Sequence, residues 1–389
     1  MINKFLTTLL GTASVLATFG VAHQAAAMNT PSAMQIDGGP LGTLDVSGGF
    51  DGSFYAYSGT GAGSILGNGK SAGANMRVVD IKVAKPDGLL RFTVEVKPDT
   101  ALYFGVPSSQ IRTDQFTLGP VFSAYLTLVP NKAFNISVGQ VPSVEGWEAS
   151  TDWENANIID SPIYYVENSS SRGVSASLNE GPVSATVIFG DGVDSGVFNT
   201  FQGLVTYSFN GDNALSVFGA ANVGRTGPNT YAYDGGKTGT GYPGYNAAYA
   251  NSNMIGGYYD YTSGNLNIVP ELQYIYSKVD HVIGLDKFTS NFGAEVITDY
   301  QFGQSPWSVG GQFFYYKNNG PQAWYLNAHS GGFGVGVTPT WQHGNLFARG
   351  EVGLLHLTNL GIPAAGGGFG ASGTDRNQVL GVLEAGVMF

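Results

Sequence analysis

The stretch NQVLGVLEAGVMF, residues Asn377 to Phe389, decides the fold. Successive residues of a β-strand point to opposite faces. One face then carries Val379, Leu383, Ala385, Val387 and Phe389, and the other carries Leu380, Val382, Glu384, Gly386 and Met388. A closed barrel in lipid suits this pattern, because its last strand pairs with its first and turns one face to hydrocarbon. An ordinary buried C-terminal strand is the alternative, since single short alternating runs are weak signals.

Alternation recurs along the chain. Residues 89–97, 116–129, 266–277 and 288–302 each interleave apolar with polar residues, and the charges fall mostly opposite the apolar face. This is the apolar-out, polar-in pattern of a water-filled barrel. A β-sandwich also alternates, with its polar face outside, so alternation alone does not decide between them.

Connection lengths separate the two folds. Seven short turns, rich in Pro, Asn, Asp and Gly, alternate strictly with eight long connections. Outer-membrane barrels have this arrangement, with tight periplasmic turns and longer outer loops, whereas a sandwich has no reason to sort its loops. We therefore predict an all-β fold, a single antiparallel transmembrane β-barrel of about sixteen strands with both termini periplasmic. The expected strands are 44–57, 75–85, 89–97, 116–129, 133–141, 171–178, 183–190, 200–209, 214–223, 252–262, 266–277, 288–302, 307–316, 331–342, 346–357 and 377–389.

The N-terminus has the features of an exported protein. Lys4 precedes a mostly apolar or small stretch, residues 5–21, and Ala25-Ala26-Ala27 fits a signal-peptidase site. We expect a signal peptide at 1–27, a loose periplasmic lead-in at 28–43 and the barrel at 44–389. No later run is long and apolar enough for a membrane helix, so a membrane-spanning form would have to cross as strands.

Composition excludes several classes of function. The 389 residues include no cysteine, so disulfides and thiolate metal sites are impossible. The net charge of −11 becomes −12 without Lys4, which argues against nucleic acid as a partner. Charged residues make up only 12%, about half the usual share, and glycine is abundant at 58 residues.

Two places resemble a known family. Gly49–Tyr57 (GFDGSFYAY) lies on the first expected strand, and Val138–Pro142 (VGQVP) leads into Glu145–Glu148 (EGWE). Asn155 and Asn157 follow, and Ser171-Arg172 opens the next strand. Together these stretches resemble the OmpL-like beta-barrel porins, outer-membrane channels of Gram-negative bacteria. The resemblance implies a barrel and passive diffusion of small solutes, with sugars proposed for some members, but supplies no defined site. The third loop here is more acidic than the family pattern, so sugar specificity is not carried over.

The segment 142–171 is the longest expected loop. Its apolar residues would be out of place on a loop exposed to water, and loops of this length are usually functional. By our count it is the third outer loop, which in porin-like barrels folds inward and narrows the lumen. A cap packed over the barrel mouth is the alternative. The residues expected at the constriction are Glu145, Trp147, Glu148, Asp152, Trp153, Glu154 and Asp160.

The polar strand faces should line the pore, because a Lys or Arg facing lipid at mid-bilayer costs about 2–4 kcal/mol. The expected pore-lining residues are Asp80, Lys82, Arg91, Glu95, Glu271, Glu295, Asp299, Arg349, Glu351 and Glu384. Phe389 resembles the C-terminal signal by which outer-membrane barrels are recognised for assembly.

Signals for catalysis or cofactors are weak. His329 and Ser330 are adjacent, so they would face opposite sides of a strand, and no triad pattern occurs. Residues 67–71 (GNGKS) lack the first glycine of a phosphate loop, and Asp191, Asp194 and Ser195 do not complete a calcium loop. We expect no enzyme activity, no cofactor and no metal.

The resulting hypothesis is a porin-like channel in the outer membrane of a Gram-negative bacterium. It would pass small hydrophilic solutes with a modest preference for cations. Its partners would be outer-membrane lipid, the barrel assembly machinery and the solutes. The sequence does not distinguish a monomer from a homo-oligomer such as a trimer. The alternatives are a barrel with a plugged lumen, acting as an adhesin or enzyme, and a soluble secreted β protein.

Overall fold

The computed structural model describes residues 28–59, 72–106, 120–193, 195–227, 247–362, 367–370 and 372–389. The expected signal peptide, residues 1–27, lies outside the described residues, as do residues 67–71 and Asp194. Helix is nearly absent from the described parts, where the helical segments are α2 (Ala247–Ala250) and the short 3-10 helices η1 (Gly39–Leu41), η2 (Asp152–Glu154), η3 (Tyr164–Val166) and η5 (His281–Ile283). No described helix is long and apolar enough to cross a membrane.

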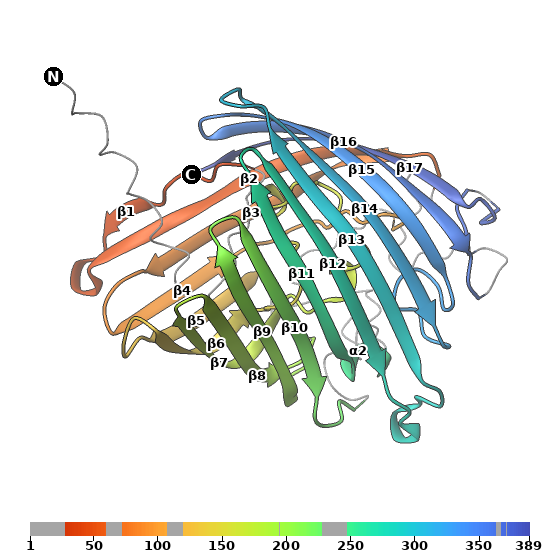
Figure 1. Ribbon diagram of the computed structural model, residues 1–389, viewed down its shortest axis with the longest axis horizontal. Helices are drawn as coiled ribbons and strands as arrows, with labels where there is room; N and C mark the ends of the chain where they lie inside the picture. Colours follow the sequence, from red (N-terminus) through yellow and green to blue (C-terminus); the bar gives the residue numbers. More distant parts are fainter. Residues whose placement is uncertain are drawn as a thin grey trace.

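Sixteen antiparallel strands within the described residues close into a barrel (Figure 1). Each strand pairs with the next along the chain, and the last pairs with the first from Leu380 opposite Tyr57 to Met388 opposite Gly49. The predicted fold class is confirmed. The barrel strands are β2 (Thr43–Tyr57), β3 (Ala72–Lys85), β4 (Leu90–Val96), β5 (Val121–Leu128), β6 (Phe134–Pro142), β7 (Ser170–Glu180), β8 (Val183–Asp191), β9 (Phe198–Asn210), β10 (Asn213–Asn222), β11 (Asn253–Ser263), β12 (Leu266–Ser277), β13 (Thr289–Gln301), β14 (Trp307–Asn319), β15 (Gly331–His343), β16 (Leu346–Asn359) and β17 (Asn377–Met388).

The observed strands follow the predicted ones closely because turn residues fix one end of each hairpin. Gly88, Gly264 and Gly344 adopt φ of +85°, +59° and +57° in the turns that follow β3, β11 and β15. Such values are readily adopted by glycine and strained for most other residues. At the turn after β5, Asn131 Oδ1 accepts hydrogen bonds from two backbone N–H groups, those of Ala133 and Phe134. This is the turn chemistry that made the strand ends predictable.

The expected loose lead-in at 28–43 is instead ordered where it meets the barrel. Strand β1 (Met34–Asp37) pairs with β2 from Met34 opposite Val46 to Asp37 opposite Thr43. The backbone of Phe389 exchanges two hydrogen bonds with Gly48, two residues beyond Val46 on β2. Strand β1 therefore pairs with the part of β2 that β17 does not reach. Residues 34–37 are ordered there because an unpaired strand edge offers backbone donors and acceptors to a neighbouring segment.

The strands alternate as expected on the outer face. Phe313, for example, is exposed between the buried residues Gln312 and Phe314 on β14. Exposed apolar side chains of this kind form the surface that a barrel presents to lipid. The inner face is less uniformly polar than expected, since Phe314, Leu355 and Leu380 also point inward and are buried.

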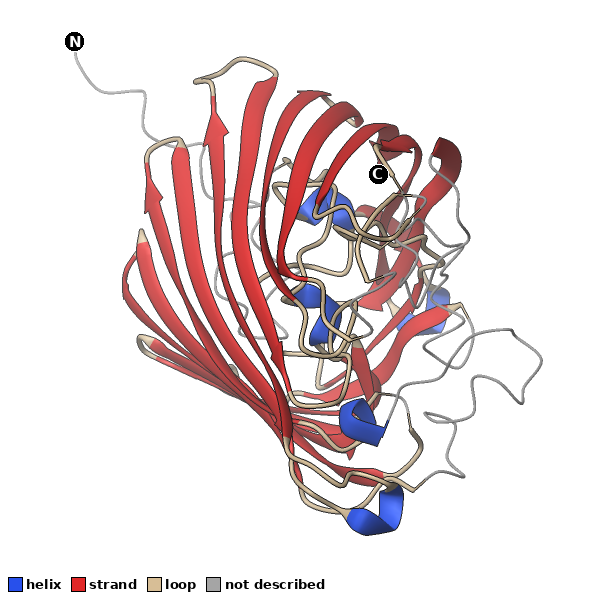
Figure 2. Ribbon diagram, turned by 90° about the vertical axis from the view of Figure 1, so that its right-hand side faces the viewer, coloured by secondary structure: helices blue, strands red, loops and turns tan. Residues whose placement is uncertain are grey.

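Those inward apolar residues belong to a core inside the barrel. Some of the connections, with short helices among them, lie within the ring of strands, as Figure 2 shows. One buried cluster joins inward residues of β2, β14, β16 and β17 to residues of the connections at 102–106, 158–163 and 325–326. The barrel interior therefore holds a packed core, which is why the inner face carries apolar residues.

Candidate functional site

Residues 143–169, here called the inner loop, join β6 to β7 and run inside the barrel. The backbone N–H of Ser143 donates to Ser169 O at 3.2 Å, so the two ends of the loop meet. Between them the loop contacts residues at the middle of the strands, including Glu271 of β12 and Glu351 of β16. The loop therefore lies within the barrel and does not merely cap its mouth.

Glycines on the inner face make room for the loop. A Cβ at Gly310 of β14 would lie 2.0 Å from Ala156 O, and one at Gly293 of β13 would lie 2.5 Å from Ile163 Cγ1. Real Cβ contacts are almost never shorter than 3.0 Å. These positions thus permit a close approach of backbone to loop that any other residue would block.

Aromatic side chains hold the first half of the loop against the wall at two places. Trp147 packs edge-on against Tyr258 of β11, with ring centroids 5.3 Å apart. Trp153 lies 6.3 Å from Phe347 of β16 and is almost fully buried. Both tryptophans were expected in this loop as constriction residues, and both serve in the structure as buried anchors.

The wall also binds the loop through its backbone. Glu351 Oε2 accepts hydrogen bonds from the N–H groups of Ile158 at 2.6 Å and Ile159 at 2.9 Å. Gln312 Nε2 donates to Ile159 O at 2.8 Å, and Glu271 Oε2 accepts from Trp147 N at 3.0 Å. Backbone groups removed from water need such partners, and here inward side chains supply them in place of a strand or helix.

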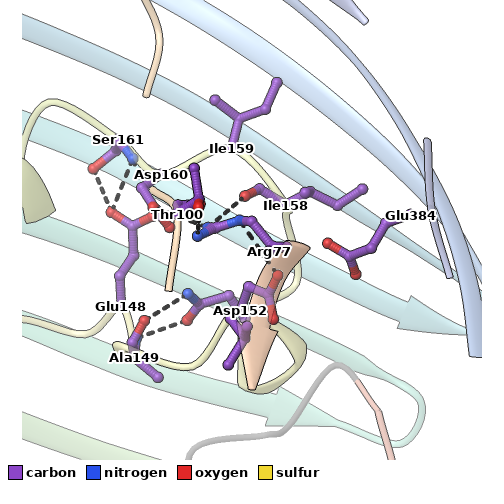
Figure 3. Close-up of polar contacts among 12 residues, drawn as sticks. Arg77, Thr100, Glu148, Ala149, Asp152, Ile158, Ile159, Asp160, Ser161 and Glu384 are labelled. Carbon is purple, nitrogen blue, oxygen red and sulfur yellow. Dashed lines mark hydrogen bonds and ion pairs between the residues drawn. The ribbon is translucent and has the colours of Figure 1, made fainter. Parts of the chain in front are cut away.

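Two buried arginines tie acidic residues of the loop to the barrel, and Figure 3 shows the first of them, Arg77. Arg77 of β3 lies 3.4 Å from Asp152 and 3.2 Å from Asp160, and its guanidinium also donates to Thr100 O at 2.6 Å. Arg349 of β16 pairs with Glu384 of β17 at 2.7 Å and approaches Asp152 at 3.7 Å. Burial acts to raise the pKa of Asp152, but the two arginines outweigh it and hold that pKa below its usual value.

Five glutamates form a second group, the glutamate cluster, where the loop faces β12 and β13. Its members are Glu145, Glu148 and Glu167 from the loop and Glu271 and Glu295 from the wall. Glu271 and Glu295 are directly opposite each other in the sheet, and among the described residues no ion pair reaches any of the five. Burial raises the pKa of Glu145 to about 7 and also raises the pKa values of Glu148 and Glu167, with neighbouring carboxylates adding to the effect at the last two.

The other expected loop acids differ from these. Burial raises the pKa of Asp160 to about 7, although Arg77 acts in the opposite direction. Glu154 is only half-buried, and burial raises its pKa above the usual value although Lys82 and Lys97 act to lower it. Together with the glutamate cluster, these residues make the inner loop an acidic element inside the barrel.

The expected wall residues fall into groups. Lys82 and Glu95 are paired at 3.6 Å, and Glu95 also lies 3.7 Å from Lys97. Asp80 is buried and Asp299 is half-buried, while Arg91 donates to Gly88 O in an exposed turn, away from the loop. Glu271, Glu295, Arg349, Glu351 and Glu384 are all buried. Glu271, Arg349, Glu351 and Glu384 form hydrogen bonds or ion pairs with the loop or with a neighbouring strand. A pore-lining role for the ten stays a prediction.

Sequence reasoning missed Arg77, Asp51 and Lys97. Simple alternation places Arg77 on the other face of the strand from Asp80 and Lys82. A register shift between Phe50 and Gly52, in the pairing of β2 with β3, instead leaves both Arg77 and Val78 buried. A bulge of this kind is not visible in the alternation. Asp51 alternates with apolar neighbours on the first expected strand and could have been found.

The family model "Putative beta-barrel porin-2, OmpL-like" matches residues 44–389. The chain belongs to this family. It is therefore a porin-like β-barrel of the outer membrane, and porins of this kind are usually channels without enzyme activity. Outer-membrane lipid and diffusing solutes are the surroundings that such a barrel implies. A comparison with curated proteins finds no match.

Solved structures share the fold at low sequence identity. The anion-selective porin from Comamonas acidovorans has a TM-score of 0.59 at 14% identity, covering 89% of this chain and 99% of that one. The outer membrane channel DcaP of Acinetobacter baumannii has a TM-score of 0.55 at 13% identity, with coverage of 92% and 100%. OmpF of Salmonella typhi, in complex with daunomycin, has a TM-score of 0.53 at 12% identity, with coverage of 92% and 100%. At these identities the similarity concerns the fold.

Proposed function

We propose that the chain is a water-filled diffusion channel for small hydrophilic solutes, with a modest preference for cations. The carrying observation is the inner loop, which holds six carboxylates between residues 143 and 169 and no Lys or Arg, and which lies inside the barrel. Carboxylates beside a narrow passage attract cations and repel anions. In this proposal the inner loop is the constriction, and the inward wall residues continue the acidic surface above and below it.

The charges on the wall also favour cations over anions. Of the ten expected pore-lining residues, seven are acidic and three are basic. Two further inward bases, Arg77 and Lys97, are each paired with acids and therefore leave little free positive charge. Screening acts over about 10 Å at 0.1 M salt, so fixed charges at a constriction matter most at low ionic strength.

The reversal potential across a planar bilayer in a potassium chloride gradient tests this proposal. The wild-type channel should prefer cations, more strongly at low salt. The double variant Glu148→Gln, Glu154→Gln should weaken the preference, most clearly at alkaline pH, where the raised pKa values of these two residues leave more of their carboxylates ionised. Asp152 is left intact because its removal would strand Arg77 and Arg349 without a shared partner. The control is Asp212→Asn, Asp286→Asn, which makes the same charge change at exposed positions. An anion-selective wild-type pore would overturn the proposal. Equal effects of the two double variants would show that the loop carboxylates do not set the selectivity.

A barrel plugged by its own connections is the second candidate. The extent of the inner core favours it, since Phe104, Ile159 and Tyr325 are almost completely buried inside the barrel. The same bilayer recordings distinguish the two, because a plugged barrel that reconstitutes correctly gives no steady conductance.

We also propose that both termini face the periplasm. Phe389 pairs with Gly48, and the neighbouring Asp45 pairs with Ala84 close to the short turn after β3. Short turns face the periplasm in outer-membrane barrels. A protease added to intact cells should therefore cleave an epitope tag inserted in the connection 278–287 and spare one attached to Phe389.

A further inference from the structure

Three carboxylates from three different elements meet inside the barrel. Asp51 lies on β2, Glu384 on β17 and Asp152 on the inner loop, and one oxygen from each lies within 4.8 Å of the others. The three residues are only 4%, 3% and 2% exposed, respectively. Strands β2 and β17 are the pair that closes the barrel, so this group joins the closing seam to the loop.

Several oxygens of this group have no donor. Asp51 Oδ1 accepts from Val78 N at 2.8 Å, and Glu384 Oε1 accepts from Arg349 at 2.7 and 2.8 Å. The second oxygens of Asp51 and Glu384, and both oxygens of Asp152, accept no hydrogen bond from the described residues. Buried carboxylate oxygens normally have interaction partners. These unpartnered oxygens therefore indicate a ligand that binds to them.

Ser53 gives an independent indication. It is 6% exposed, and its Oγ has no hydrogen-bond partner among the described residues. It lies two residues beyond Asp51 on the same face of β2 and directly opposite Glu384 in the sheet. A neutral hydroxyl oxygen is thus placed beside the carboxylates, and oxygen atoms are the ligands that hard cations prefer.

The charge of the surrounding network fits a divalent cation. Arg77 and Arg349 pair with Asp152, Asp160 and Glu384, and Asp51 adds a further carboxylate. Asp99 also acts on Arg77, so the carboxylates of this network outnumber its two guanidinium groups and leave negative charge that a divalent ion would offset. The two arginines approach Asp152 only at 3.4 and 3.7 Å, so they do not satisfy its oxygens.

We propose that Asp51, Asp152 and Glu384, with Ser53 Oγ, bind one divalent cation, Ca²⁺ in preference to Mg²⁺. Ligand oxygens around Ca²⁺ lie at about 2.3–2.6 Å from the ion, so two of them are up to about 5 Å apart, whereas the octahedral shell of Mg²⁺ requires about 4 Å. Separations of up to 4.8 Å between the oxygens are compatible with the larger ion. The ion fixes the inner loop to β2 and β17, and its removal loosens the constriction at that end.

Calorimetry and thermal unfolding test the proposal on the full chain in detergent after treatment with EDTA. CaCl₂ should bind with one site per chain and raise the unfolding temperature, and MgCl₂ should do so at higher concentration. Asp51→Asn keeps an oxygen for Val78 N–H and removes one charged ligand, so the Kd for Ca²⁺ should rise at least about tenfold. The control is Asp45→Asn, another buried aspartate on β2, which should bind Ca²⁺ like the wild type.

A measurement on the wild-type chain covers the case in which Asp51→Asn fails to fold. Tb³⁺ replaces Ca²⁺ in oxygen sites, and Trp153 is the neighbour of Asp152 in sequence, so excitation of tryptophan should give Tb³⁺ emission that Ca²⁺ displaces. Absence of that emission, or of any Ca²⁺ binding, overturns the proposal. An unfolding temperature that rises as the pH falls in EDTA and does not change with Ca²⁺ also overturns the proposal, because protons would then neutralise the carboxylates.

Discussion

Gly310 offers the most direct test of how the inner loop is held. In Gly310→Ala the new Cβ would lie 2.0 Å from Ala156 O, about 1 Å closer than such contacts allow, and the obstacle is backbone. Strand and loop must separate by about that distance. The hydrogen bond from Gln312 Nε2 to Ile159 O, now 2.8 Å, would then exceed the limit for a hydrogen bond.

The expected cost follows from those two effects. Overpacking costs about 1–3 kcal/mol and each lost hydrogen bond about 1 kcal/mol, so the docked loop should lose about 2–4 kcal/mol. The population of the undocked loop then rises by roughly 30-fold or more, since 1.4 kcal/mol is a factor of ten.

A single engineered thiol measures that population, because the chain has no cysteine of its own. Ile158→Cys places the thiol at a buried position of the loop, where maleimide reacts only after undocking. Adding Gly310→Ala should accelerate the reaction of this thiol with maleimide by roughly 30-fold or more. The matched control is Gly381→Ala on β17, where a Cβ meets nothing within 4 Å. If both alanine variants react with maleimide as slowly as Ile158→Cys alone, the close contact at Gly310 does not hold the loop.

Two further predictions concern assembly and pH. Deleting Phe389 should reduce the amount of protein in the outer membrane far more than it lowers the unfolding temperature of what is assembled, because the residue would act as an assembly signal. Unchanged membrane levels would refute that reading. The pKa of Glu145 is raised to about 7, above its unfolded value, so the folded state binds the extra proton and stability falls as pH rises from about 4.5 to 7. The loss approaches about 3 kcal/mol. Glu145→Gln should therefore flatten the unfolding temperature between pH 5 and 8, measured in detergent, and slopes equal to those of the wild type would contradict this.

The barrel could be predicted because its determinants are local. Alternation along each strand and the turn residues of the short connections, such as Gly88, Gly264 and Asn131, act through neighbours in sequence. The closing strand pair followed from the alternation of residues 377–389. The placement of charges toward the interior followed from the cost of placing them in lipid.

The arrangement inside the barrel could not be predicted in the same way. Leu355 and Leu380 point inward although a polar lining was expected, because connections pack against them. Asp152 was expected among the constriction residues, but its position between two arginines was not foreseen. Its partner Arg349 lies 197 residues further along the chain, and a single sequence carries no sign of such a pairing.

The position of the inner loop has a consequence for the order of assembly. The loop precedes β7, yet its partners Glu271, Glu351 and Arg349 lie between 124 and 197 residues later. Contacts of such long range form slowly, because the chain between them must first be brought into place. Until β12 to β17 have paired, no wall covers Trp147, Trp153 and Ile158. Their exposed apolar surface can then associate with other chains. The half-built barrel is thus the vulnerable species, and docking of the loop marks its completion.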